Sequence, residues 1–116
     1  MRILGSKGES LAVKFLKTKG YKIISRNYKT AIGEIDIIAQ DGETVVFIEV
    51  KTRANDAFGY PFEAVHSRKR RKLKNLALLY LKNHGKELPV RFDVLSIMYI
   101  EDSIKEIEHI KDAFEV

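Results

Sequence analysis

The sequence predicts an α/β fold in which a mixed β-sheet is flanked by two main helices. Residues 6–20 and 61–85 space their apolar side chains as amphipathic helices do. Residues 21–29, 34–51 and 90–99 contain short runs rich in Ile, Val, Phe and Tyr, as strands do. The order is α-β-β-β-α-β, and a 45% apolar composition is sufficient for one domain spanning residues 1–116.

The first helix and strand have recognisable ends. Ser6 and Glu9 have the spacing of a capping box, and Gly20 is the residue type that usually closes a helix. The core-facing stripe between them is Leu11, Ala12, Phe15 and Leu16. A first strand over 21–29 follows, with Tyr21, Ile23 and Ile24 as its apolar residues.

The next two strands form a hairpin over residues 34–51. Asp41-Gly42 favours a two-residue turn, which sets Gln40 opposite Glu43. With this register Asp36 faces Phe47, and Glu34 faces Glu49. Since side chains alternate along a strand, the turn predicts four charged residues on one face: Glu34, Asp36, Glu49 and Lys51.

The second half of the chain supplies a helix and the end of the sheet. A loop over 52–60 leads to Pro61, which suits the first turn of a helix. Its core-facing stripe is Leu73, Leu76, Ala77 and Tyr80, and residues 83–85 close it. A strand over 90–99 follows. Residues 103–110 indicate either an extra strand or a helix, because their isoleucines also have helical spacing.

The charged face of the hairpin is the strongest functional signal. Burying unpaired charge costs several kcal/mol, and like charges opposite one another on a sheet repel. A divalent cation between the carboxylates would turn that repulsion into binding. The alternative is a salt bridge of Lys51 with Glu49 or Asp36 and no metal.

The basic residues surround this acidic centre along the chain. Residues 1–30 hold eight Lys/Arg and one acid, and residues 66–91 hold nine and one. Residues 31–65 hold two Lys/Arg and seven acids. This arrangement predicts a polyanionic ligand such as a nucleic acid, with the acids holding a metal. The alternative is that the basic runs only solvate helix faces.

A helix carrying Glu9, a strand carrying Asp36 and a strand carrying Glu49 and Lys51 follow one another in the chain. This order resembles the active-site layout of the restriction-endonuclease-like superfamily, written PD-(D/E)xK, and its spacing is similar to that of archaeal Holliday junction resolvases. The whole chain resembles more closely the YraN-like family of small, poorly characterised bacterial proteins. The matching pieces are Gly8-Glu9, Gly20-Tyr21, Arg26-Asn27, Gly33-Glu34-Ile35-Asp36, Phe47-Ile48-Glu49-Val50-Lys51, Arg53, Phe58-Gly59 and Arg91-Phe92-Asp93. Ser10 departs from the resolvases, which carry arginine there.

The resemblance implies a restriction-endonuclease-like fold and metal-dependent hydrolysis of phosphodiester bonds in DNA, in particular branched or irregular DNA. It implies that Asp36 and Glu49 bind Mg²⁺ or Mn²⁺, helped by the carbonyl of Val50. Glu9 would complete the metal site, or would only cap its helix with Ser6. Lys51 would orient or help to deprotonate the attacking water, or stabilise charge on the phosphate. The alternative function is a non-catalytic nucleic-acid-binding or adaptor protein with the same fold.

The remaining expectations concern partners and surroundings. Phosphate contacts are expected from five basic residues: Arg53, Arg68, Lys69, Arg71 and Lys72. The related resolvases imply a symmetric homodimer. We expect a cytoplasmic protein, because no apolar run is long enough for a membrane span and the first twenty residues are rich in lysine. His66, His84 and His109 are expected at the surface or in caps, and Arg91 is expected to bridge to Asp93.

Overall fold

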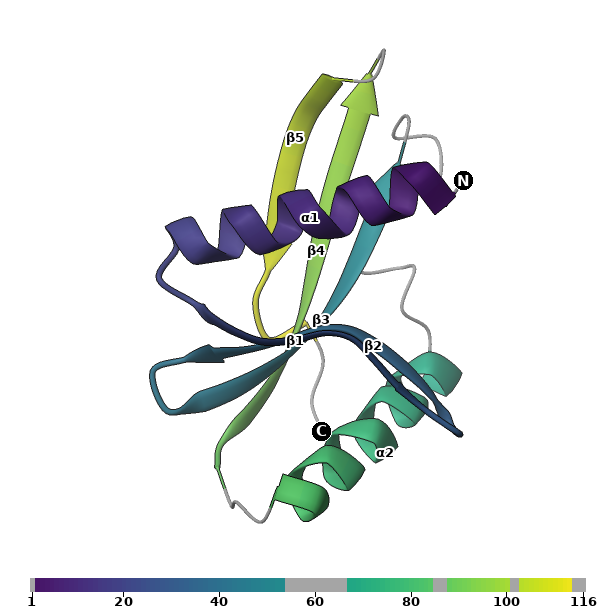
Figure 1. Cartoon of the computed structure of the whole chain (residues 1–116), viewed down its shortest axis with the longest axis vertical. Coiled ribbons are helices and arrows are strands. Elements are labelled where there is room, and N and C mark those ends of the chain that lie inside the picture. The colour runs from purple at the N-terminus through teal and green to yellow at the C-terminus, as the bar shows by residue number, and fades with distance from the viewer. Residues whose placement is uncertain (1, 54–66, 85–87, 101–102, 114–116) are drawn as a thin grey trace.

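The computed structural model describes residues 2–53, 67–84, 88–100 and 103–113, and it confirms the predicted α/β architecture (Figure 1). Its sheet has five strands in the order β1-β2-β3-β4-β5, antiparallel except for the parallel pair β3 and β4. The extra strand over 103–110 is present as β5. In chain order the elements are α1 (Arg2–Thr18), β1 (Lys22–Thr30), β2 (Gly33–Asp41), β3 (Thr44–Arg53), α2 (Ser67–His84), β4 (Val90–Ile100) and β5 (Ser103–Ile110).

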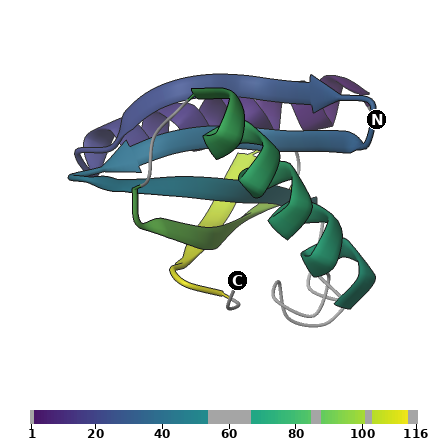
Figure 2. The ribbon, with the colours of Figure 1, turned by 90° about the horizontal axis from the view of Figure 1, so that it is seen from below.

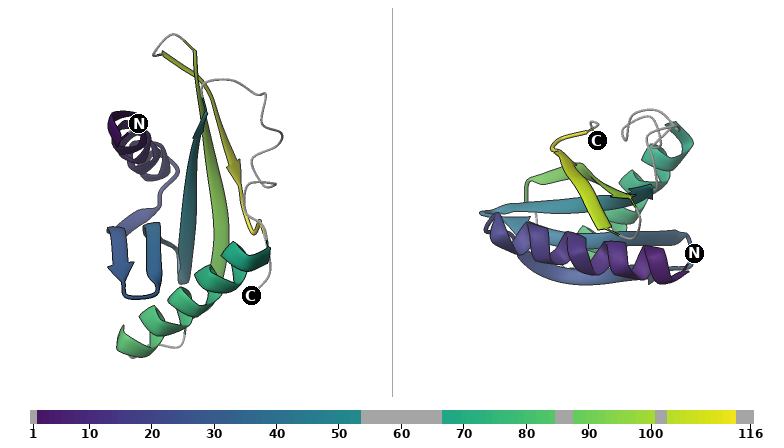
Figure 3. Two further views of the ribbon diagram at one scale, coloured as in Figure 1. Left: turned by 90° about the vertical axis from the view of Figure 1, so that its right-hand side faces the viewer. Right: turned by 90° about the horizontal axis from the view of Figure 1, so that it is seen from above.

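The two helices cover opposite faces of the twisted sheet. Figure 1 shows α1 above the β1–β2 hairpin and α2 below it. Figure 2 shows the molecule from below, with α2 in front of the sheet. Under α1 the core contains Ala12 and Leu16, and under α2 it contains Leu73, Leu76 and Ala77. Both predicted stripes are therefore confirmed. β3, β4 and β5 extend the sheet away from the β1–β2 hairpin (Figure 3).

The turn between β2 and β3 differs from the predicted one. Asp41 pairs with Thr44, so the two-residue loop is Gly42-Glu43 and not Asp41-Gly42. Gly42 has a φ of 63°, which suits the first position of a two-residue hairpin loop. The predicted pairs of Asp36 with Phe47 and of Glu34 with Glu49 were therefore wrong. The shift is two residues, which preserves the face of every side chain on β3.

The predicted capping box was also wrong. α1 begins at Arg2, so Ser6 lies inside the helix and cannot be its N-cap. The cap interpretation of Glu9 fails with it, because Glu9 stands in the third turn of α1.

Some expectations concern the part of the chain outside the described residues. These are residues 54–60 of the loop predicted over 52–60, the helix start at Pro61, and His66. The predicted start of that loop was wrong, because β3 continues through Thr52 to Arg53. Within the described ranges, no helix has the length and apolar character needed to cross a membrane.

Candidate functional site

Asp36 stands where the regular alternation of β2 breaks. Ile35 and Ile38 both pack in the core under α2, whereas Ile37 packs under α1. On β1 the residue opposite Asp36 is Asn27, which falls between two paired positions and has a φ of 53°. The ladder between β2 and β3 has its last pair at Ile37 and Ile48. β2 and β3 therefore diverge at Asp36.

The carboxylate of Asp36 occupies the gap that this divergence leaves. Its Oδ2 accepts the backbone N–H of Val50 at 2.8 Å. Since the N–H and C=O of one strand residue point to the same neighbouring strand, the carbonyl of Val50 is directed to this side as well. The splayed strands thus bring carboxylate and carbonyl oxygens together, which are the ligand types that hard divalent cations prefer.

Glu49 on β3 crowds Asp36. Glu49 is only 8% exposed, and the two carboxyl groups share a hydrogen bond. Burial first, and then the charge of Glu49, raise the pKa of Asp36 to about 7. The charge of Glu9 acts in the same direction. The positive charge around this pair of carboxyl groups is therefore too small to keep both of them ionised near neutral pH.

Lys51 lies beside this pair, with Nζ 3.8 Å from Oε1 of Glu49. The salt bridge expected by the metal-free interpretation is therefore present. It does not balance the site, because the pKa of Asp36 stays raised despite this lysine. On β4 the buried Ser96 stands opposite Lys51 in the parallel register, a position that sequence reasoning did not single out.

Gly8 explains how Glu9 comes near the site. A Cβ at Gly8 would overlap the methyl group of Thr52, so α1 crosses β3 in close contact directly after Lys51. This crossing places Glu9 within electrostatic reach of Asp36. Three carboxylates from α1, β2 and β3 thus act on one region. No group of three or more His, Cys, Asp or Glu side chains in the described part of the chain is close enough to form a metal cluster.

A cavity of about 260 Å³ opens over the carboxylates, and we call it the acidic cavity. It is lined by Gly33, Glu34, Asp36, Glu49 and Lys72. Lys72 reaches it from α2 because Gly33 has no side chain: a Cβ there would lie 3.0 Å from Cε of this lysine. The sequence predicted Lys72 at a phosphate but did not place it in the lining of a cavity with the carboxylates. Only the packing of α2 on the hairpin shows that placement.

The other predicted phosphate contacts are partly described. Arg71 is exposed on α2, on the side away from its buried stripe, and Lys74, which was not among the predicted contacts, is exposed one turn further along. The side chains of Arg53, Arg68 and Lys69 lie outside the described part of the structure, although their backbones belong to β3 and α2.

A second polar cluster ties the strands together on the α1 face of the sheet. Asp93 is 1% exposed and receives two hydrogen bonds from Arg91, at 2.9 and 3.0 Å. Arg91 also donates to Asp41 at 3.1 Å and to Tyr21 at 2.6 Å. His109 binds Asp93 at 2.7 Å. The predicted Arg–Asp bridge is confirmed, but the surface placement of His109 was wrong, because β5 brings its ring into this cluster.

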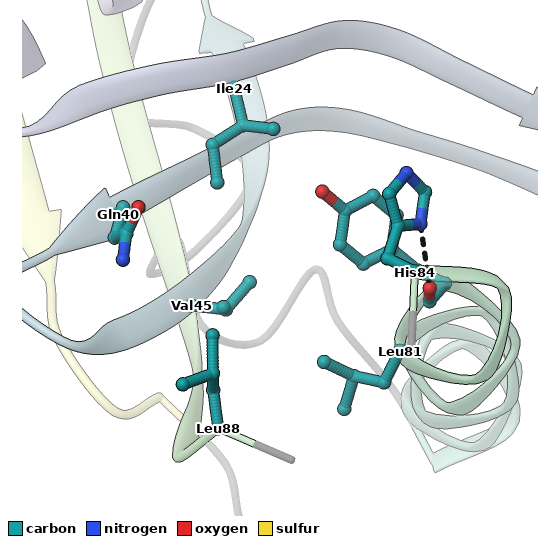
Figure 4. A pocket seen from close by; sticks show the side chains of 7 residues that line it. Ile24, Gln40, Val45, Leu81, His84 and Leu88 are labelled. Atoms are coloured by element: carbon teal, nitrogen blue, oxygen red, sulfur yellow. Dashed lines mark hydrogen bonds between the residues drawn. The ribbon is translucent and has the colours of Figure 1, made fainter. Parts of the chain in front are cut away.

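A separate, mostly apolar hollow of about 120 Å³ lies between the hairpin and the end of α2 (Figure 4). Its lining includes Ile24, Val45 and Leu81. His84 donates from Nδ1 to the carbonyl of Tyr80 at 2.8 Å and so caps the helix, as predicted. None of the described residues that line this hollow carries a carboxylate, in contrast to the acidic cavity.

Comparison with other proteins adds a family to this geometry. The model of UPF0102, described as an uncharacterised protein family, matches residues 8–97. The chain belongs to the UPF0102 family. The match includes Glu9, Asp36, Glu49, Lys51 and Lys72, and it confirms the YraN-like resemblance.

Relatives within UPF0102 align over almost the whole chain. A UPF0102 protein of Thermodesulfovibrio yellowstonii is 53% identical over 111 residues, which cover 96% of this chain and 95% of the relative. One from Geotalea uraniireducens is 48% identical over 114 residues, with 97% and 90% covered. One from Clostridioides difficile is 46% identical over 111 residues, with 95% of each covered.

Proposed function

We propose that this UPF0102 protein is a metal-dependent nuclease that hydrolyses phosphodiester bonds in DNA, in particular branched or irregular DNA. The observation that carries the proposal is the crowded pair of Asp36 and Glu49. These carboxylates share a hydrogen bond, Lys51 lies 3.8 Å from Glu49, and both carboxylates open onto one cavity that Lys72 also lines. Perturbed carboxyl groups in a cavity are characteristic of functional sites.

The donor set fits Mg²⁺ or Mn²⁺. Asp36 and Glu49 would hold the ion, with the Val50 carbonyl beside them and Glu9 acting from α1. Few protein ligands are needed, because Mg²⁺ retains several waters. When bound, such an ion would offset charge on the phosphate and lower the pKa of a water.

Two lysines have separate roles in this proposal. Lys51 would orient the attacking water or help to remove its proton, since it lies 3.8 Å from Glu49. The oxygen of that water would form the new bond to phosphorus as the bond to the leaving sugar oxygen breaks, and a proton would pass to the leaving oxygen. Lys72 would bind the phosphate from the α2 side of the acidic cavity. A symmetric dimer would present two such sites. Light scattering with and without DNA measures whether the protein is a dimer.

The first experiment is calorimetric titration of Mg²⁺ and Mn²⁺ into three proteins. The wild type and Glu43→Gln should bind the ions equally, because Glu43 is an exposed turn residue away from the cavity. The double variant Asp36→Asn, Glu49→Gln should bind neither ion. Absence of binding by the wild type, with or without a DNA junction, would contradict the nuclease proposal and favour a non-catalytic nucleic-acid-binding or adaptor protein.

The second experiment separates metal binding from cleavage. Lys51→Gln should keep Mg²⁺ affinity and lose cleavage of branched DNA by on the order of a hundredfold or more. Cleavage unchanged in this variant would remove Lys51 from the mechanism.

A further inference from the structure

The tip of the β1–β2 hairpin lies next to α2 (Figure 1) and carries an isoleucine that shares an open hollow with basic residues of that helix. We call residues 30–33 the hairpin tip. Ile32 is 46% exposed. With Arg71, Lys72 and Asn75 of α2 it surrounds an open hollow of about 380 Å³. A single exposed apolar side chain is ordinary, but this one lies among cationic and amide groups that suit phosphates and bases.

The hairpin tip is held in place by its own hydrogen bonds. The hydroxyl of Thr30 accepts the N–H of Ile32 at 3.2 Å and donates to the carbonyl of Gly33 at 3.1 Å. These bonds fix the loop on both sides of Ile32. The backbone at Ile32 is therefore ordered before a partner binds, which reduces the conformational entropy that the loop loses on binding.

The hairpin tip is also fixed against α2. Gly33 has a φ of 145°, and a Cβ there would lie 3.0 Å from Cε of Lys72 and 3.4 Å from Cδ1 of Leu76. Only glycine allows both this backbone angle and this close approach. Ile32 thus has a defined position relative to the cations of α2.

Lys72 lines both the hollow and the acidic cavity, so the two are neighbours at this residue. A phosphate held by Lys72 would lie between Asp36 and Glu49 on one side and Ile32 on the other. The bases next to that phosphate would then meet the side chain of Ile32.

We propose that Ile32 is an apolar wedge that contacts unpaired or unstacked bases where a DNA duplex branches or ends, while Arg71 and Lys72 hold the adjoining phosphates. This inference rests on the proposed function and specifies its substrate. Inserting an apolar side chain between stacked bases costs the free energy of unstacking them. That cost is smallest where the bases are already unpaired. The wedge therefore selects branched DNA over continuous duplex.

The test is a binding measurement in EDTA, which depends on neither metal binding nor cleavage. Fluorescence anisotropy is recorded with a DNA fork, a continuous DNA duplex containing the same number of phosphates, and an RNA fork of the same sequence. The wild type should prefer the DNA fork over the duplex. Ile32→Ser should weaken fork binding about tenfold and leave duplex binding unchanged. Ile32→Leu should retain the preference.

Two controls make the result specific. Ile24→Ser removes another exposed isoleucine of β1, 40% exposed and outside the lining of the hollow, and should change neither affinity. Lys72→Gln should weaken fork and duplex binding alike, because phosphate contacts carry no preference for unpaired bases. A 2-aminopurine beside the branch should change its fluorescence with the wild type but not with Ile32→Ser.

Each outcome decides the proposal. A wild type without fork preference, or an Ile32→Ser variant that keeps it, overturns the wedge. A stronger preference for the RNA fork overturns DNA as the substrate. If the preference disappears in Ile32→Ser although the wild type binds no Mg²⁺ and cleaves nothing, the wedge is supported and the nuclease proposal fails.

Discussion

At the scale of single residues, Asp36 makes the metal-free protein sensitive to pH. Its pKa is raised to about 7 from an ordinary value of 3.8, by burial and then by Glu49. Between these two values the folded state holds a proton that the unfolded state has lost. The stabilisation from this proton is complete below pH 4 and is lost as the pH rises through about 7.

The resulting prediction concerns the free energy of unfolding in EDTA. Relative to the wild type, Asp36→Asn should become progressively more stable between pH 4.5 and 8, because the amide carries no charge to bury. Urea unfolding at several pH values measures the difference. If the two stability curves stay parallel across this window, Asp36 does not titrate there. Mg²⁺ binding at pH 6 should release about one proton, since a ligating carboxylate must be ionised.

Asp93 has the opposite behaviour, although it is more deeply buried. Burial alone would raise its pKa, but the hydrogen bonds from His109 and Arg91 hold it below the ordinary value. Its contribution to stability is therefore present above the unfolded pKa and is lost as the pH falls through the folded one.

Removing the charge of Asp93 should destabilise the fold, because its partners would stay buried without the carboxylate that they bind. Asp93→Asn removes the buried carboxylate that accepts two hydrogen bonds from Arg91 and leaves this arginine with Asp41 as its described carboxylate partner, which should destabilise the fold by about 3–5 kcal/mol. Urea unfolding at pH 7 measures the loss. Asp112→Asn is the matched control, because its side chain is exposed and asparagine tolerates its φ of 52°. Equal losses in the two variants would contradict this role.

At the scale of elements, the position of α1 on β3 depends on Gly8. Replacing a helical glycine by alanine ordinarily stabilises a helix by about 1 kcal/mol. Here the added methyl group would overlap that of Thr52. Gly8→Ala should therefore destabilise the protein by about 1–3 kcal/mol and weaken Mg²⁺ binding, because α1 carries Glu9.

A double-mutant cycle tests this contact directly. Thr52→Ser removes the overlapping methyl group, so Gly8→Ala should cost little in that background. The measurements are urea unfolding and Mg²⁺ calorimetry on the four proteins. Additive effects of the two substitutions would show that the contact does not position α1.

The elements also show what sequence patterns determine. Apolar spacing was enough to predict both helices and the first four strands, because burial dictates it, whereas the isoleucines of 103–110 fitted a strand or a helix and only the structure shows β5. The partner of each hairpin residue was not predictable, since Asp41-Gly42 and Gly42-Glu43 are both acceptable turns. The wrong register still placed Asp36 and Glu49 on one side, because a shift of two residues conserves the faces. The prediction of the helix start was wrong for a different reason. A capping signal is local, and the helix begins before it, because Arg2–Gly5 are also helical.

At the scale of the whole molecule, the unpredicted contacts join segments far apart in the chain. Lys72 meets Gly33 and the acidic cavity, and His109 meets Asp93, only through the packing of α2 and β5. The spacing of residues along the sequence does not predict these contacts. The carboxylates of the candidate site were predictable because a buried strand with acids is unusual in itself.

The net charge of +5 allows two explanations of the proposed nucleic-acid binding, and the fold separates them. If only net charge matters, lysines on either face are equivalent. If DNA lies along α2 beside the acidic cavity, Arg71 and Lys74 contribute, whereas Lys14 and Lys17 on α1 do not. Both pairs of side chains are exposed. The α2 double variant (Arg71→Gln with Lys74→Gln) and the α1 double variant (Lys14→Gln with Lys17→Gln) therefore remove the same charge without disturbing the core.

The measurement is duplex binding at several salt concentrations. The α2 variant should lower the slope of log affinity against log salt by about 1.8, roughly 0.9 for each phosphate that the protein no longer neutralises. The α1 variant should keep the wild-type slope, and equal slopes in the two variants would mean that the α2 face has no special role.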